Sequence, residues 1–141
     1  MQTRYFALFI GIVYLLVGIL GFFPGLGSDP SRDIAVDSLY FSLFGLFDVN
    51  ILHTLVHLLV GVAGIVAYRE FDTARLYARA LAVVYGVLAV FGVIPGLNDL
   101  FGLVPLWGAD VILHAATALI AAYFGWVVPA PAEERRRAAV H

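Results

Sequence analysis

The sequence of 141 residues contains no cysteine and no lysine, and charged residues make up only 13% of it. Without cysteine the chain cannot form a disulfide, a thiolate metal site or a thiol nucleophile. A net charge of −2 leaves no basic surface for nucleic acid. Hydrophobic residues make up 62% of the chain, against about 45–50% in a soluble domain. The core of a 141-residue chain cannot bury so many hydrophobic residues, so we expect the chain to lie in a lipid bilayer.

Four segments carry no charge, at residues 5–28, 49–68, 80–98 and 111–132. Each is close to the roughly 20 residues that cross a bilayer as a helix. The first is longer than the roughly 7–15 residues of a signal-peptide core, so we expect it to be retained. The predicted fold is an all-α four-helix membrane bundle with helices at about 5–24, 49–68, 77–95 and 108–128. They form one domain, residues 1–132, followed by a polar cytoplasmic tail at 133–141.

The arginines are distributed unequally between the two sides of this four-pass arrangement. Only Arg32 lies on one side, and the side rich in arginine stays in the cytoplasm, which places both termini there. The arginines on that side are Arg4, Arg69, Arg75, Arg79, Arg135, Arg136 and Arg137. The opposite side is acidic.

The chain contains an internal repeat. The pattern of small residues, one tyrosine and a final Pro-Gly-Leu at residues 11–26 recurs at 82–97, and Ile-Leu-His at 51–53 recurs at 112–114. The repeated unit is a pair of apolar segments, which predicts two tandem helical hairpins at about 5–68 and 76–128. Both copies cross in the same direction, so the repeat is parallel.

Small residues recur at intervals of three and four along the expected helices, which places them on single faces. Such faces let helix backbones approach closely in lipid. We expect the first and third helices to face the bundle centre or each other, and the chain to associate with further copies or a membrane partner through these faces. The glycines concerned are Gly11, Gly18, Gly21, Gly61, Gly64 and Gly92.

The first outer loop, roughly residues 26–47, begins polar and then becomes aromatic. Aromatic rings are favourable at the membrane interface. We therefore expect a short interfacial helix over residues 40–47.

Three histidines fall inside the apolar segments. His53 and His57 are four residues apart, on one helical face, and His114 occupies the place of His53 in the second repeat. At about 1.5 Å per residue, Tyr14 and Tyr85 lie at the depth of His57. Ionisable residues in a bilayer suggest a functional site by default. The other residues expected in or beside this polar layer are Asn50, Asp48 and Asp110, the two carboxylates being hydrated at the interface.

Three interpretations of this layer are open. Neutral imidazoles can hold helices together, at roughly 0.6 kcal/mol per hydrogen bond. His53 and His114 can be the axial ligands of a b-type haem. His53, His57 and His114 can bind zinc or copper. The sequence shows neither a Ser–His–Asp order nor a phosphate-binding loop, so it predicts no catalytic residue.

Residues 45–64, with the string Asp-Val-Asn-Ile-Leu-His-Thr-Leu-Val-His, resemble a bacterial four-helix membrane family known as domain-of-unknown-function family 4383. Residues 17–25 and 113–114 are similar to its first and last helices, and the resemblance extends from residue 4 to about 125. It implies an inner-membrane protein and no assigned reaction, cofactor or substrate.

We therefore expect a non-enzymatic accessory or scaffold subunit of a membrane complex. The first alternative is a haem- or metal-binding redox protein that uses the three histidines, and the second is an oligomeric transporter or channel.

Overall fold

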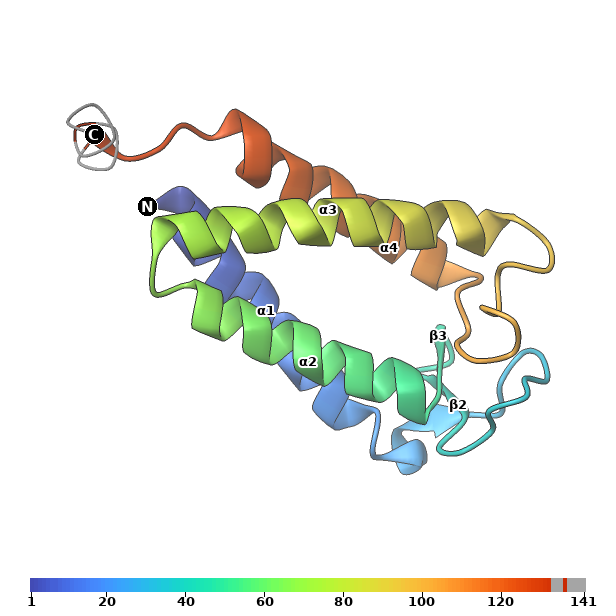
Figure 1. The fold of residues 1–141 in the computed structure, drawn as a ribbon. Helices are drawn as coiled ribbons and strands as arrows, with labels where there is room; N and C mark the ends of the chain where they lie inside the picture. Colours follow the sequence, from blue (N-terminus) through green and yellow to red (C-terminus); the bar gives the residue numbers. More distant parts are fainter. Residues whose placement is uncertain (133–135, 137–141) are drawn as a thin grey trace.

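In the computed structural model, which describes residues 1–132 and residue 136, the chain forms four α-helices and a small antiparallel sheet at one end (Figure 1). The helices are α1 (Gln2–Leu20), α2 (Ile51–Ala67), α3 (Phe71–Val93) and α4 (Ala109–Ala122). A 3₁₀ turn, η1 (Pro24–Leu26), follows α1, and a π-helical turn, η2 (Tyr123–Val127), continues α4. The fold is mostly helical, as predicted. The tail predicted at 133–141 lies outside the described residues, except for Arg136.

Three helical segments in the described part of the chain are long and apolar enough to cross a membrane: α1, α3, and α4 with its π-helical turn. The fourth, α2, is apolar but has only 17 residues. Large apolar side chains cover the outside of the helices, and Phe9, Leu59 and Leu119 are each 65% exposed or more. A surface of this kind is suited to lipid rather than to water.

Glycines bring α1 and α2 into close contact. A Cβ atom at Gly11 would lie 2.7 Å from the Ile65 amide nitrogen, and one at Gly61 would lie 2.5 Å from that of Leu15. At Gly18, Gly21 and Gly64, too, atoms of the facing helix lie where a Cβ atom would be. The glycine face of α1 therefore packs against α2, whereas we expected it to face the bundle centre or the third helix.

The second helical pair is α3 with α4, and Gly92 of α3 lies against the segment that leads into α4. A Cβ there would meet the Leu106 carbonyl oxygen. Between the two pairs, α1 and α3 share the contact of Tyr14 with Tyr85, whose ring centroids are 5.3 Å apart. That the two pairs are copies of one unit stays a prediction.

The helix ends differ from their predicted positions by up to six residues, and two of these differences have a clear cause. α1 stops at Leu20 instead of residue 24, because the residue before a proline is disfavoured in the α region, and Phe23 has φ −118° and ψ 77°. α3 starts at Phe71 instead of residue 77. Its first turns carry charged residues on the outside, which hydropathy excludes from a span, while Phe71 and Ala74 are buried.

The outer loop forms a sheet, so the helix expected over residues 40–47 was wrong. Its strands are β1 (Gly27–Ser28), β2 (Phe41–Leu43) and β3 (Phe47–Val49), in the order β1-β2-β3. Phe44 and Gly45 adopt positive φ values of 55° and 68°, and this tight reversal lets Leu43 pair with Phe47. The sheet lies at the end of the bundle where α2 begins (Figure 1).

Candidate functional site

The first turn of α2 fixes the position of the histidine pair. Asn50 caps the helix, because its side-chain oxygen accepts a hydrogen bond from the His53 amide at 3.0 Å. Its amide group also donates to the carbonyls of Val36 at 3.0 Å and Leu103 at 2.7 Å. One side chain therefore joins the start of α2 to both outer loops, and His53 follows one turn inside.

Five aromatic side chains from four helices form a closed circuit. Its members are Tyr14 on α1, His53 and His57 on α2, Tyr85 on α3 and His114 on α4. Around the circuit the ring centroids are 5.1 Å apart for Tyr14–His57, 4.4 Å for His57–His53 and 6.2 Å for His53–His114. The circuit closes through His114–Tyr85 at 5.0 Å and Tyr85–Tyr14 at 5.3 Å. The structure thus brings together the histidines and tyrosines of the predicted layer.

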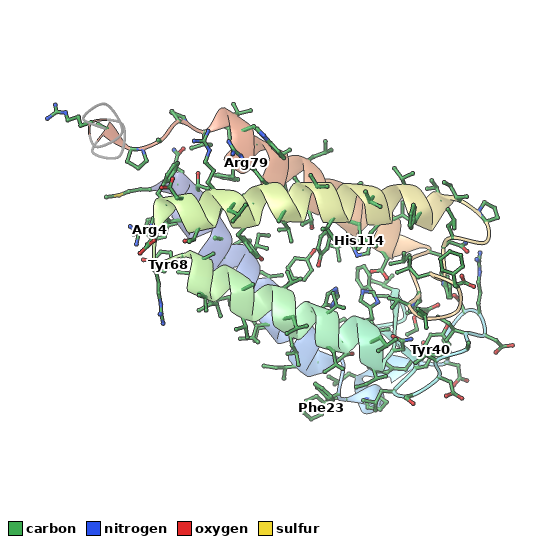
Figure 2. All side chains as sticks on the ribbon, viewed as in Figure 1. Arg4, Phe23, Tyr40, Tyr68, Arg79 and His114 are labelled. Carbon is green, nitrogen blue, oxygen red and sulfur yellow. The ribbon has the colours of Figure 1, made fainter. Side chains whose placement is uncertain are left out.

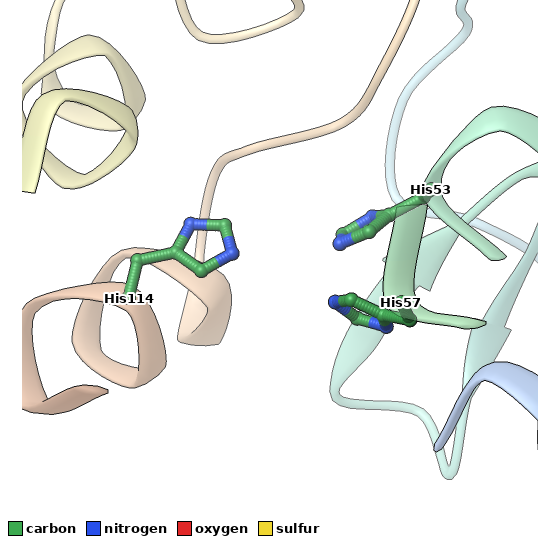
Figure 3. A group of neighbouring side chains, drawn as sticks. All are labelled: His53, His57 and His114. Atoms are coloured by element: carbon green, nitrogen blue, oxygen red, sulfur yellow. The ribbon is translucent and has the colours of Figure 1, made fainter. Parts of the chain in front are cut away.

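The three imidazoles face one buried space. Each offers a ring nitrogen, and these nitrogens lie within 4.8 Å of one another. Figure 3 shows His114 reaching from α4 toward His53 and His57 on α2, and Figure 2 shows its ring between the helical pairs. The cavity that the histidines line has a volume of about 220 Å³ and is also lined by Leu100, Val104 and Leu106.

Several polar atoms in this layer have no hydrogen-bond partner among the described residues. They include Nδ1 of His53, Nε2 of His57 and Nδ1 of His114. All three side chains are 3% exposed or less. A buried polar atom without a partner costs about 1–3 kcal/mol. Among the described residues, these three atoms therefore make no hydrogen bond that joins one helix to another.

Asp110 lies beside the histidines in the first turn of α4. Its carboxylate Oδ2 is 3.8 Å from Nδ1 of His53, which is longer than a hydrogen bond. The residue is 1% exposed, and within residues 1–132 and 136 neither carboxylate oxygen has a hydrogen-bond partner. The expectation that Asp110 stays hydrated at the interface was therefore wrong, because the outer loops fold over it.

Asp48 is buried too, but among the outer loops. Its Oδ2 accepts hydrogen bonds from the Ser31 amide at 3.2 Å, from the Ser31 hydroxyl and from Nε1 of Trp107 at 2.9 Å. Burial by itself raises the pKa of the Asp48 carboxyl, but these hydrogen bonds outweigh it and hold the pKa below its usual value. We expected Asp48 in or beside the polar layer with hydrated oxygens, but its carboxylate is buried and hydrogen-bonded instead.

Thr117 was not predicted as part of this layer, but its hydroxyl is 3.0 Å from that of Tyr14. The signal was available, since Thr117 follows His114 by three residues on the same face of an Ala- and Leu-rich helix. The partnership of Asp48 with Ser31 and Trp107 had no such signal, because 17 and 59 residues separate them.

No curated protein and no solved structure matches the chain. The family of the domain of unknown function DUF4383 matches over residues 4–127, which confirms the resemblance found in the sequence. Since this match covers most of its length, the chain belongs to the DUF4383 family.

Proposed function

We propose that this chain is a four-pass protein of the bacterial inner membrane that holds one zinc or copper ion on His53, His57 and His114. The observation that carries the proposal is the convergence of three imidazoles from two helices on one buried cavity. Imidazole is a good ligand for both metals, and three histidines leave a fourth position open. Ligand nitrogens sit about 2.0–2.1 Å from zinc, so the side chains must draw together from their present spacing.

A metal ion accounts for the geometry better than a haem. A b-type haem takes one imidazole on each face of a planar macrocycle. Placed between His53 and His114, the macrocycle would displace His57, whose ring centroid is 4.4 Å from that of His53. A single ion uses all three imidazoles without moving one aside.

The four-pass topology is supported by the path of the chain. If α1 and α3 both cross the membrane in the same direction, α2 must return the chain between them, and Figure 1 shows α2 running back along α1. Arg4 lies beside Tyr68 at the end that carries the N-terminus, whereas Tyr40 is at the opposite end (Figure 2). By the positive-inside rule the N-terminal end is cytoplasmic.

A cysteine introduced by Asp33→Cys should react with an impermeant thiol reagent on intact cells; reaction only after lysis would contradict this topology.

The parallel repeat also belongs to this proposal. His53 and His114 are equivalent in the two halves, as are Tyr14 and Tyr85, and both pairs contribute to the aromatic circuit. His57 is the exception, because Ala118 stands at its place in the second half. Two equivalent histidines and one additional histidine would make the three-ligand set.

The second candidate is a non-enzymatic accessory or scaffold subunit of a membrane complex. The broad apolar exterior of the helices favours it, since such a surface can contact another membrane protein as well as lipid. The glycine faces of α1 and α2 are occupied by each other, and Gly92 of α3 lies against the segment that leads into α4. Association would therefore depend on the larger outward-facing apolar side chains.

The test is a metal analysis and an absorption spectrum of the protein purified in mild detergent, before and after incubation with zinc or copper and removal of free ion. We expect about one ion per chain in the wild type. The variants His53→Ala and His114→Ala should lose it, while the matched control His141→Ala, which changes the remaining histidine of the sequence, should retain it. Equal metal content in all four proteins, or none in the wild type, would contradict the proposal. A Soret band would identify a haem instead.

A further inference from the structure

We infer that Asp110 is a positioning residue of this site, which holds the His53 imidazole with Nδ1 toward the carboxylate and Nε2 toward the ion. The inference rests on the proposed metal site and names a residue outside its ligand set. Asp110 Oδ2 is 3.8 Å from Nδ1 of His53, and both side chains are buried. Asp110 is not among the residues whose ligand atoms converge.

The orientation of the His53 ring fits this role. Its two nitrogens lie on different sides of the ring, so a ring with Nδ1 toward Asp110 has Nε2 free for another partner. The free end of the His53 ring, which carries Nε2, points toward His114 (Figure 3). Asp110 and the ion would therefore occupy opposite sides of one imidazole.

The surroundings of Asp110 leave it few other partners. With His57 it lines a small cavity of about 80 Å³, whose remaining wall is apolar and includes Val17, Leu43 and Leu113. Neither carboxylate oxygen has a hydrogen-bond partner in the described part of the chain. Nδ1 of His53, also unpaired, is the polar atom that the carboxylate approaches.

Binding of the ion would complete this contact. Metal-bound histidines usually donate their other ring N–H to a carboxylate or carbonyl, which fixes the tautomer and makes the imidazole a stronger ligand. The present 3.8 Å between Nδ1 of His53 and Oδ2 of Asp110 is too long for a hydrogen bond, so the Asp110 side chain must move toward His53 when the ion binds on the other side of the ring. The carboxylate also offsets positive charge that three neutral ligands leave uncompensated in a medium of low dielectric constant.

α4 thus makes two contributions to the site. His114 supplies a ligand, and Asp110, one turn earlier, orients a ligand on α2. The contact between Asp110 and His53 joins helices of different pairs. If Asp110 positions His53, the His53 ring is held in one tautomer, whereas packing alone would not select a tautomer.

The test uses the full chain in detergent, with Asp110→Leu, Asp110→Asn and the exposed control Asp37→Asn. Zinc affinity is measured by competition with a chelating dye, and the tautomer of His53 by nitrogen-15 NMR of histidine-labelled protein, with its signals assigned through His53→Gln. We expect the Nδ1–H tautomer in the wild type. Asp110→Leu should weaken zinc binding about 10–100-fold and give a mixture of tautomers.

Asp110→Asn retains an oxygen that can accept a hydrogen bond from Nδ1–H of His53, so this variant should keep the tautomer and lose less zinc affinity. Asp37→Asn should match the wild type in both measurements. An unchanged zinc affinity in Asp110→Leu, or an Nδ1–H tautomer that persists in it, would overturn the inference while leaving the metal site intact. A wild type that binds no zinc or copper would overturn the proposed function, and the tautomer of the metal-free protein would still report on the contact between Asp110 and His53.

Discussion

Asp48 and Asp110 are two buried carboxylates at the same end of the bundle, with opposite surroundings. Asp48 accepts hydrogen bonds from two residues of the outer loops, Ser31 and Trp107. Asp110 accepts none from the described residues and faces an imidazole nitrogen that is also unpaired. The first carboxylate has its partners within the fold, so its role is structural. The second lacks them, which is the condition expected of a group that completes its contacts when something binds.

The difference follows from where each residue lies. Asp48 lies in β3, where neighbouring loop residues reach its carboxylate. The donors are the amide and hydroxyl of Ser31 and the indole N–H of Trp107. Asp110 is in the first turn of α4, where helix geometry fixes its direction and the facing helix supplies His53. A carboxylate in that turn is favourable for the helix dipole, but this effect does not supply hydrogen bonds to a buried group.

Among the substitutions that test this comparison, we expect Asp48→Ala to change the free energy of unfolding most. It removes the acceptor for Ser31 and Trp107, and hydrogen bonds to a charged group contribute about 1.5–3 kcal/mol. We expect the free energy of unfolding to fall by roughly 2–3 kcal/mol. Denaturant unfolding in detergent, followed by tryptophan fluorescence, measures it. Asp37→Ala, at an exposed position, is the control; equal stability of the two variants would show that the Asp48 hydrogen bonds contribute little.

The next effect has the opposite sign. Asp110→Leu replaces an unpaired buried carboxyl group by an apolar group of similar size. We expect the metal-free protein to gain about 1–2 kcal/mol of stability, since burial of a polar group without a hydrogen bond carries a cost of that order. The same denaturant unfolding experiment tests it. A loss of stability in the metal-free variant would mean that Asp110 already has partners, and the contrast with Asp48 would disappear.

The smallest effect concerns pH. Because the pKa of Asp48 is lower in the folded chain than in the unfolded one, its ionised form stabilises the fold. This contribution is complete above the unfolded carboxyl pKa of about 4 and is lost as the pH falls through the folded value. We expect Asp48→Asn to be less stable than the wild type by about 1 kcal/mol at pH 7, with the difference shrinking below pH 4. Thermal unfolding of both proteins at several pH values measures it, and a difference that grows in acid would contradict the assignment.

The sequence predicted the parts of this molecule that depend on short-range periodicity. The four helices, the shared face of His53 and His57, and the matched depth of His114 follow from hydropathy and from residue spacing. The choice of helix partner did not follow, because a glycine face shows that a helix packs closely but does not show against which neighbour. Gly11 and Gly61 identify that neighbour only when both helices are placed.

The outer loops were the least predictable region. Residue counting along a helix put Asp110 near the surface, but it could not show that Leu106 and other residues of the second loop line the histidine cavity. The hydrogen bond from Trp107 to Asp48 joins residues 59 positions apart, which no local pattern encodes. The aromatic segment at residues 40–47 formed strands because the reversal at Phe44 and Gly45 determined its conformation more strongly than its interfacial composition did.

The length of α2 has a consequence for the kind of membrane that suits this protein. Its 17 residues extend about 26 Å at 1.5 Å per residue, less than the roughly 30 Å of a typical hydrocarbon core. The small sheet lies at the end where α2 begins, and its paired strands leave fewer backbone groups without a hydrogen-bond partner than an open loop would. If α2 crosses the membrane as proposed, a thin bilayer matches this helix best. A thick bilayer would then have to thin around α2 or draw the adjoining loops toward hydrocarbon, at the same end of the bundle where His53 lies.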